Sequence, residues 1–242
     1  MTKDYIESQE YTNDMLRGIT LSQEDYLKFH YDAEPRTANY THRHNVIRKK
    51  LGTWRWKSVF QFKDILSPII FSKDLRGIDF GGSQRPISYD VDIVDVENTD
   101  DLGRPVKYNS MDDLDFKPDF IFSSHTLEHL DDLDFYLKKF HEKLKPDGHF
   151  IAVVPSYSCK RWHANTGNWM GNEATKGTPG ALAALHKHTF VLSKTNWEFM
   201  GLNSPVEIDV KLKKYFDLKI VEYTGDNSIF ILGTNKKQNN DK

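Results

Sequence analysis

The middle of the chain alternates short apolar strands with turns and one long amphipathic helix. Four segments predict buried strands: residues 76–82 (RGIDFGG), 90–97 (DVDIVDVE), 119–124 (DFIFSS) and 149–155 (HFIAVVP). Between the last two, the helical spacing of i, i+3, i+4, i+7 and i+11 is occupied by Leu133, Tyr136, Leu137, Phe140 and Leu144. Nearly continuous apolar strands are typical of a parallel sheet buried on both faces. We therefore expect an α/β fold that binds its ligand at the carboxyl ends of the strands.

Segments on either side of this region suggest how the chain is organised. Residues 21–31 and 41–52 carry helical patterns, so residues 1–74 are predicted to form an N-terminal helical cap. Residues 75–242 are predicted to form the main domain. Within it, residues 156–205 are rich in Gly, Asn, Thr and aromatic residues and show no sustained period. An irregular segment of this length favours a substrate-binding insertion or lid.

The chain is predicted to end in a helix and two closing strands. Residues 205–217 (PVEIDVKLKKYFD) carry the helical pattern, and residues 218–236 supply two strand-like runs. Gly225, Asp226 and Asn227 lie between these runs, which predicts an antiparallel hairpin.

Composition narrows the function further. Apolar residues make up 38% of the 242 residues and charged residues 28%, which is typical of a globular protein. The formal charge of −2 gives no electrostatic reason to expect a nucleic-acid partner. A single cysteine, Cys159, excludes an internal disulfide framework. The polar, acidic N-terminus and the lack of a long apolar run predict a cytoplasmic protein without a membrane span.

Residues 77–83 (GIDFGGS) are the sharpest sign of a ligand. Gly81 and Gly82 let the backbone approach a ligand where a Cβ would collide, although a tight turn alone also explains them. Asp95, at the end of the next strand, is placed to accept hydrogen bonds from ribose hydroxyls. The loop lacks both the dinucleotide-binding motif G-x-G-x-x-G and the P-loop motif G-K-[ST]. We therefore predict a nucleoside ligand that need not carry a pyrophosphate.

Together these segments resemble the class I S-adenosylmethionine-dependent methyltransferases. Residues 77–98 are similar to the first two family motifs, in the form where a short loop replaces the first crossover helix. Residues 109–116 (NSMDDLDF) and 118–155 are similar to the third and fourth motifs and the fifth strand. The resemblance implies a Rossmann-like, seven-stranded, mostly parallel sheet with an antiparallel final strand. It also implies S-adenosylmethionine as the cofactor.

The resemblance assigns cofactor contacts position by position. Those positions are Gly81, Gly82 and Ser83 for the methionine part, Asp79 for the loop and the amino group through water, Asp95 for the ribose, Val96 for the adenine face, Ser110, Met111 and Asp112 for the adenine edge, and Ser124 beneath the sulfonium. The family's longer glycine motif is reduced here to Asp79-Phe-Gly81-Gly82-Ser83.

Residues 122–132 (FSSHTLEHLDD) allow more than one interpretation. His125-x-x-Glu128-His129 matches the H-x-x-E-H string of one group of zinc peptidases. That site needs both histidines on one helix face, whereas His125 is expected before the helix begins. We expect Glu128 and His129 to hydrogen-bond backbone groups at the helix start, and no metal. A divalent cation at these three side chains, as in some catechol-type methyltransferases, stays an alternative.

Candidate catalytic and substrate-binding residues complete the prediction. His125 would face the methyl group and is the first candidate for a general base, followed by His186 and His188. Aromatic and histidine side chains of the insertion are candidates to bind a flat ring or a sugar face: Tyr157, Trp162, His163 and Trp169. Residues 184–190 (ALHKHTF) resemble a segment of small-molecule and glycan-modifying family members.

The predicted reaction is methyl transfer to a hydroxyl of a sugar, a glycan or another polar small molecule. One alternative is N-methylation of a small molecule or protein. The N-P-P-Y-type motif of amino-group methylation in nucleic acids is replaced by Ser-Ser-His at 123–125. Another alternative is a catalytically silent methyltransferase fold that acts as a binding or scaffold protein.

Overall fold

The structure is a computed structural model of the whole chain. It describes residues 57–83, 86–88, 90–100, 103, 105–156, 192–193, 206–224 and 228–237. The predicted helices at 21–31 and 41–52 lie outside these residues, as do most of the predicted insertion and the Gly225-Asp226-Asn227 turn.

A six-stranded mixed sheet forms the centre of the described chain. Its order is β2 (Asp92–Val94), β1 (Gly77–Phe80), β3 (Phe120–Ser124), β4 (His149–Pro155), β8 (Ser228–Asn235) and β7 (Phe216–Tyr223). The first four strands pair in parallel, so their carboxyl ends lie at one edge of the sheet. The chain runs from β1 to β2 on one side and then to β3 on the other. This reversal makes the end of β1 the topological switch point, where open α/β sheets bind ligands.

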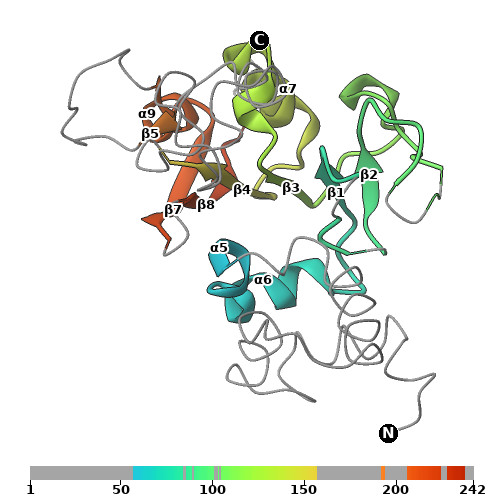
Figure 1. The fold of residues 1–242 in the computed structure, drawn as a ribbon, viewed down its shortest axis with the longest axis horizontal. Helices are drawn as coiled ribbons and strands as arrows, with labels where there is room; N and C mark the ends of the chain where they lie inside the picture. The colour runs from blue at the N-terminus through green and yellow to red at the C-terminus, as the bar shows by residue number, and fades with distance from the viewer. Residues whose placement is uncertain are drawn as a thin grey trace, which may run out of the picture.

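Helices cover both faces of this sheet (Figure 1). α5 (Lys57–Phe60) and α6 (Lys63–Ile70) lie on one face, and α7 (Leu133–Lys143) and α9 (Ile208–Leu212) lie on the other. Successive residues of β3 divide between the two faces: Phe120 and Phe122 pack on the α6 side, and Ile121 packs on the α7 side. Because both faces are buried, the central strands carry the apolar runs seen in the sequence.

The predicted amphipathic helix is confirmed as α7. It begins after Asp132, whose carboxylate accepts a 2.9 Å hydrogen bond from the Phe135 N–H. Its predicted stripe is buried against the sheet, with Tyr136 partly exposed; the fully covered members are Leu133, Leu137, Phe140 and Leu144. The antiparallel closing pair is also confirmed, since β8 runs antiparallel to both β4 and β7.

The sheet differs from the seven-stranded expectation. In the part of the chain that the structure describes, the position beyond β2 holds only an isolated parallel bridge between Val94 and Tyr108. Short strands β5 (Leu192–Ser193) and β6 (Val206–Glu207) form a separate two-stranded sheet. The predicted helix at 205–217 is shorter than expected, because α9 covers only Ile208–Leu212 and β7 starts at Phe216.

Part of the predicted N-terminal cap packs directly on the sheet. α6 continues through Pro68 to Ile70, and its buried side chains meet β-strand residues in one hydrophobic cluster. The Phe62 and Phe230 rings stack with their centroids 3.8 Å apart, which joins this segment to β8. Within the described ranges, no helix has the length and apolar character needed to cross a membrane.

Candidate functional site

The turn after β1 is shaped by the protein's own side chains. Gly81 has φ +79, and a Cβ built there would lie 2.2 Å from Thr126 Oγ1, which follows β3. A Cβ on Gly82 would lie 2.4 Å from the Asp79 carboxyl carbon. Both glycines are therefore required by close packing within the turn. The packing brings the ends of β1 and β3 together at the switch point.

Asp79 is buried beneath this turn. Asp79 is 1% exposed, and its Oδ2 accepts a 2.6 Å hydrogen bond from the Ile87 N–H. Burial raises the pKa of Asp79 to about 7, the Ile87 hydrogen bond opposes the rise, and the charge of Asp95 adds to it. Asp79 therefore anchors the loop from below through this hydrogen bond.

Asp95 follows β2 and faces the same turn. Its Oδ2 accepts the Ser83 N–H at 3.0 Å, and its Oδ1 accepts the Glu97 N–H at 3.2 Å. A carboxylate oxygen accepts more than one hydrogen bond, so both oxygens retain capacity for hydroxyl donors. The next residue, Val96, is 85% exposed.

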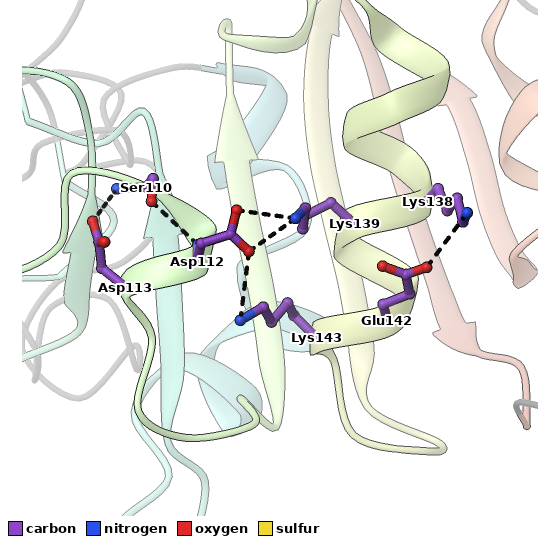
Figure 2. Close-up of polar contacts among 7 residues, drawn as sticks. All are labelled: Ser110, Asp112, Asp113, Lys138, Lys139, Glu142 and Lys143. Atoms are coloured by element: carbon purple, nitrogen blue, oxygen red, sulfur yellow. Dashed lines mark hydrogen bonds and ion pairs between the residues drawn. The ribbon is translucent and has the colours of Figure 1, made fainter.

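The predicted adenine-edge segment forms a capped 3-10 turn, η2 (Met111–Asp113). Ser110 accepts the Asp112 N–H, and Asp113 accepts the Ser110 N–H, which completes a capping box (Figure 2). Met111 is 3% exposed, so its side chain lies in the core.

Asp112 ties this turn to α7. Figure 2 shows its carboxylate pointing to Lys139, at 2.8 and 3.0 Å, and to Lys143, at 3.9 Å. The Lys139 hydrogen bond lowers the pKa of Asp112. The Asp112 carboxylate is thus engaged with α7, and Ser110 caps the turn.

The end of β3 carries Ser124 and His125. The Ser123 hydroxyl donates to the Phe80 carbonyl at 3.1 Å, and the His125 N–H donates to the Val153 carbonyl at 2.7 Å. These two hydrogen bonds hold the carboxyl end of β3 between β1 and β4. His125 has φ +53, a left-handed conformation that non-glycine residues rarely adopt. As predicted, His125 precedes the regular helix, which starts only at Leu133.

Glu128 contradicts the sequence-based expectation. It lies in the 3-10 turn η3 (Leu127–His129), is 1% exposed, and neither carboxylate oxygen accepts a hydrogen bond from the described residues. The bonds expected between Glu128 and backbone N–H groups at a helix start are therefore absent from the described chain, and α7 is capped by Asp132 instead. Sequence reasoning missed this burial, since a short turn leaves no periodic signal.

The remaining predicted site residues belong to the insertion. The candidates Tyr157, Trp162, His163, Trp169, His186 and His188 all lie outside the described residues. Across the described ranges, no group of three or more His, Cys, Asp or Glu side chains is arranged to hold a metal ion.

Comparison with known families decides the identity of the fold. A family model described as a methyltransferase domain matches residues 53–186, more than half of the chain. The chain belongs to this methyltransferase family. The predicted enzyme class, an S-adenosylmethionine-dependent methyltransferase, and its cofactor are thereby confirmed. Comparison with curated protein sequences gives no significant match.

Solved structures of methyltransferases are similar to the chain at low identity. One, from Thermotoga maritima, is an S-adenosylmethionine-dependent methyltransferase and possible histamine N-methyltransferase, with 16% identity, a TM-score of 0.43, and 67% of this chain and 83% of that chain covered. The N-methyltransferase NodS from Bradyrhizobium japonicum WM9, in complex with S-adenosyl-L-homocysteine, has 12% identity, a TM-score of 0.44, and coverages of 93% and 99%. A methyltransferase from Mesorhizobium loti has 14% identity, a TM-score of 0.42, and coverages of 66% and 90%.

The described residues are compatible with the family's cofactor. The Asp95 carboxylate suits the two ribose hydroxyls, and the exposed Val96 side chain offers an apolar face for a base. These two features occur side by side at the carboxyl edge, where a nucleoside is expected.

Proposed function

We propose that this methyltransferase acts on a hydroxyl of a sugar, a glycan or another polar small molecule, with His125 as the base. The observation that carries the proposal is the position of His125 directly after β3. Its neighbour Thr126 packs on Gly81, so His125 lies one residue from the contact between the β1 and β3 ends. The His125 side chain is 19% exposed, and its Nε2 atom is buried.

The proposed cofactor contacts follow the same edge. Asp95 accepts hydrogen bonds from the ribose, Val96 packs on the adenine, and Ser110 lies at the adenine edge. The turn at 81–83 borders the methionine part, with Ser124 beneath the sulfonium. When bound, S-adenosylmethionine supplies an electrophilic methyl carbon, whose bond to sulfur breaks as the bond to the acceptor oxygen forms.

His125 then has a defined task. Most of the rate of an in-line methyl transfer comes from holding the acceptor oxygen against the methyl carbon. A hydroxyl must also lose its proton, and the His125 imidazole accepts it. Tyr157, Trp162, His163 and Trp169 of the insertion are proposed to hold the acceptor, and His186 and His188 are the other candidate bases.

An acceptor panel tests this function. Purified protein is incubated with S-adenosylmethionine carrying a ¹³C methyl group and, separately, glucose, a uridine-diphosphate sugar, catechol or an alkylamine. Mass spectrometry and NMR then identify the atom that receives the label. Labelled oxygen supports the proposal. Label on nitrogen alone establishes the N-methyltransferase alternative, and cofactor binding without any transfer in a widened panel favours a silent binding protein.

The His125→Gln variant tests the base. With a hydroxyl acceptor, we expect its rate to fall by roughly 100-fold or more, because general-base catalysis contributes that much. His149→Gln is the matched control: His149 begins β4, at the opposite edge of the sheet, and its variant should keep the rate within about twofold. A His125→Gln enzyme with the wild-type rate would remove His125 from the mechanism.

A further inference from the structure

Glu128 is a buried carboxyl group next to two histidines. Its Oε1 lies 3.6 Å from His125 Nδ1 and 3.8 Å from His129 Nε2. Among the described residues, no group donates a hydrogen bond to either of its oxygens. Burying a carboxylate without a donor is costly, so a group at this position needs a partner.

Both imidazoles lie within 4 Å of a Glu128 oxygen, and His125 is the better placed donor of the two. The His125 backbone is fixed by the hydrogen bond to Val153, and its ring is 19% exposed. His129 is 36% exposed, so its ring has access to water as an alternative partner. Both distances exceed a normal hydrogen bond, but such contacts often shorten when a ligand closes the site.

We propose that Glu128 positions His125 by accepting its Nδ1–H, which leaves Nε2, buried in this structure, as the basic nitrogen that a bound acceptor must reach to lose its proton. A neutral imidazole carries one proton, so a carboxylate beside Nδ1 selects the tautomer in which Nε2 is basic. A buried carboxylate has this role in the Ser-His-Asp triad, where its loss leaves the wrong tautomer. The proposal rests on the proposed function of His125, but the tautomer itself is a property of the protein without substrate.

The position of Glu128 in the chain explains why it can reach His125. The left-handed His125 residue turns the backbone after β3, and η3 follows at once, so residue 128 folds back toward residue 125. The turn buries Leu127 and Glu128 together. Both Glu128 oxygens are buried from water, which strengthens their interaction with a nearby N–H.

NMR spectroscopy of the histidine rings tests the proposal directly. Protein labelled with ¹⁵N-histidine, without added cofactor, is measured at pH 8.5 by two-bond ¹H–¹⁵N correlation. The His125 signals are those missing from His125→Asn. We expect the wild-type proton on Nδ1. In Glu128→Met, which removes the acceptor at similar volume, we expect it on Nε2. Glu128→Gln keeps a carbonyl oxygen and should keep the proton on Nδ1.

Stability and kinetics separate positioning from a structural role. Glu128→Met should melt at the same temperature as the wild type or higher, because an apolar side chain replaces a buried carboxylate. With a hydroxyl acceptor from the panel, its kcat should fall roughly 10- to 100-fold, with the acceptor KM within about threefold. If no acceptor is methylated on oxygen, the proposed function fails while the tautomer measurement still decides the role of Glu128.

Three results would overturn the proposal. The first is a wild-type His125 with its proton on Nε2, and the second is an unchanged tautomer in Glu128→Met. The third is specific broadening of the His125 and His129 signals by micromolar Mn²⁺, which would make Glu128 a cation ligand. His129→Asn is the matched control, and it should leave the His125 tautomer unchanged.

Discussion

At the end of β1, two glycines and an aspartate occupy a space that would not hold another side-chain carbon. A Cβ on Gly82 would meet the Asp79 carboxyl, and one on Gly81 would meet Thr126. The sequence predicts the glycine turn and its acidic neighbour, because both are local. It does not predict Thr126, which approaches only once β1 and β3 pair. The contact that brings His125 to the switch point is therefore a property of the fold.

Burial of Asp79 predicts how stability depends on pH. Its pKa is raised from 3.8 to about 7, so between about pH 4 and pH 7 the unfolded chain has lost this proton while the folded chain keeps it. The folded state then binds more protons, and the free energy of unfolding falls as pH rises through this range. The Asp79 contribution is on the order of 4 kcal/mol.

Urea unfolding at pH 4.5 and pH 7.5 measures this effect. We expect Asp79→Asn to lose less stability than the wild type between the two values, since its amide does not ionise and its oxygen still accepts the Ile87 N–H. Asp64→Asn is the control, because the Asp64 side chain is 92% exposed, and it should follow the wild type. Equal pH dependence in wild type and Asp79→Asn would contradict the account.

Among the elements, α7 shows best what periodicity predicts. Its five apolar positions set its length and its buried face, and Asp132 caps its start. The turn η3 has no such period, so the burial of Glu128 had no signal in the sequence. Within the described residues, the sheet beyond β2 likewise holds one bridge at Tyr108, and α9 covers only Ile208–Leu212, because pairing and packing override weak local preferences in short elements.

The C-terminal end of α7 depends on one side chain of β8. Asn235 is 2% exposed, and its Nδ2 donates to the carbonyl oxygens of His141, Leu144 and Lys145 at 3.0, 2.9 and 3.2 Å. Its Oδ1 lies 2.6 Å from His141 Nδ1, which donates in this arrangement. Asn235 thus satisfies the last carbonyls of the helix, which have no partner within it.

Removing this side chain should destabilise the whole protein. We expect Asn235→Ala to lower the free energy of unfolding by about 2–4 kcal/mol, because several buried polar groups lose their partner. Thr234→Ala, one residue earlier in the same strand and partly exposed, should cost less than about 1 kcal/mol. Both values come from urea titration followed by circular dichroism. A loss of equal size in the two variants would show that Asn235 has no special role.

On the scale of the whole molecule, helices on both sides leave the carboxyl edge of the sheet as the place for a ligand (Figure 1). A stacked pair of aromatic rings packs on each face of the sheet: Phe62 with Phe230 on one face, and Phe150 with Phe216 on the other. The sequence predicts this architecture, since apolar strands and an amphipathic helix specify burial directly. Acceptor choice is proposed to lie with the predicted insertion at 156–205, whose irregular sequence carries no periodic signal and therefore gives only residue types.

Calorimetric titration with S-adenosylmethionine tests whether Asp95 belongs to a cofactor site at the carboxyl edge of the sheet. We expect micromolar binding by the wild type, and binding weaker by roughly 10- to 100-fold in Asp95→Ala, which loses hydrogen bonds to a charged group. Asp92→Asn is the matched control: Asp92 begins β2, the strand that Asp95 follows, and pairs with Arg76 at 2.9 Å, so this variant should bind as the wild type does. Failure of the wild type to bind S-adenosylmethionine, or equally tight binding by Asp95→Ala, would contradict a cofactor site at this edge of the sheet.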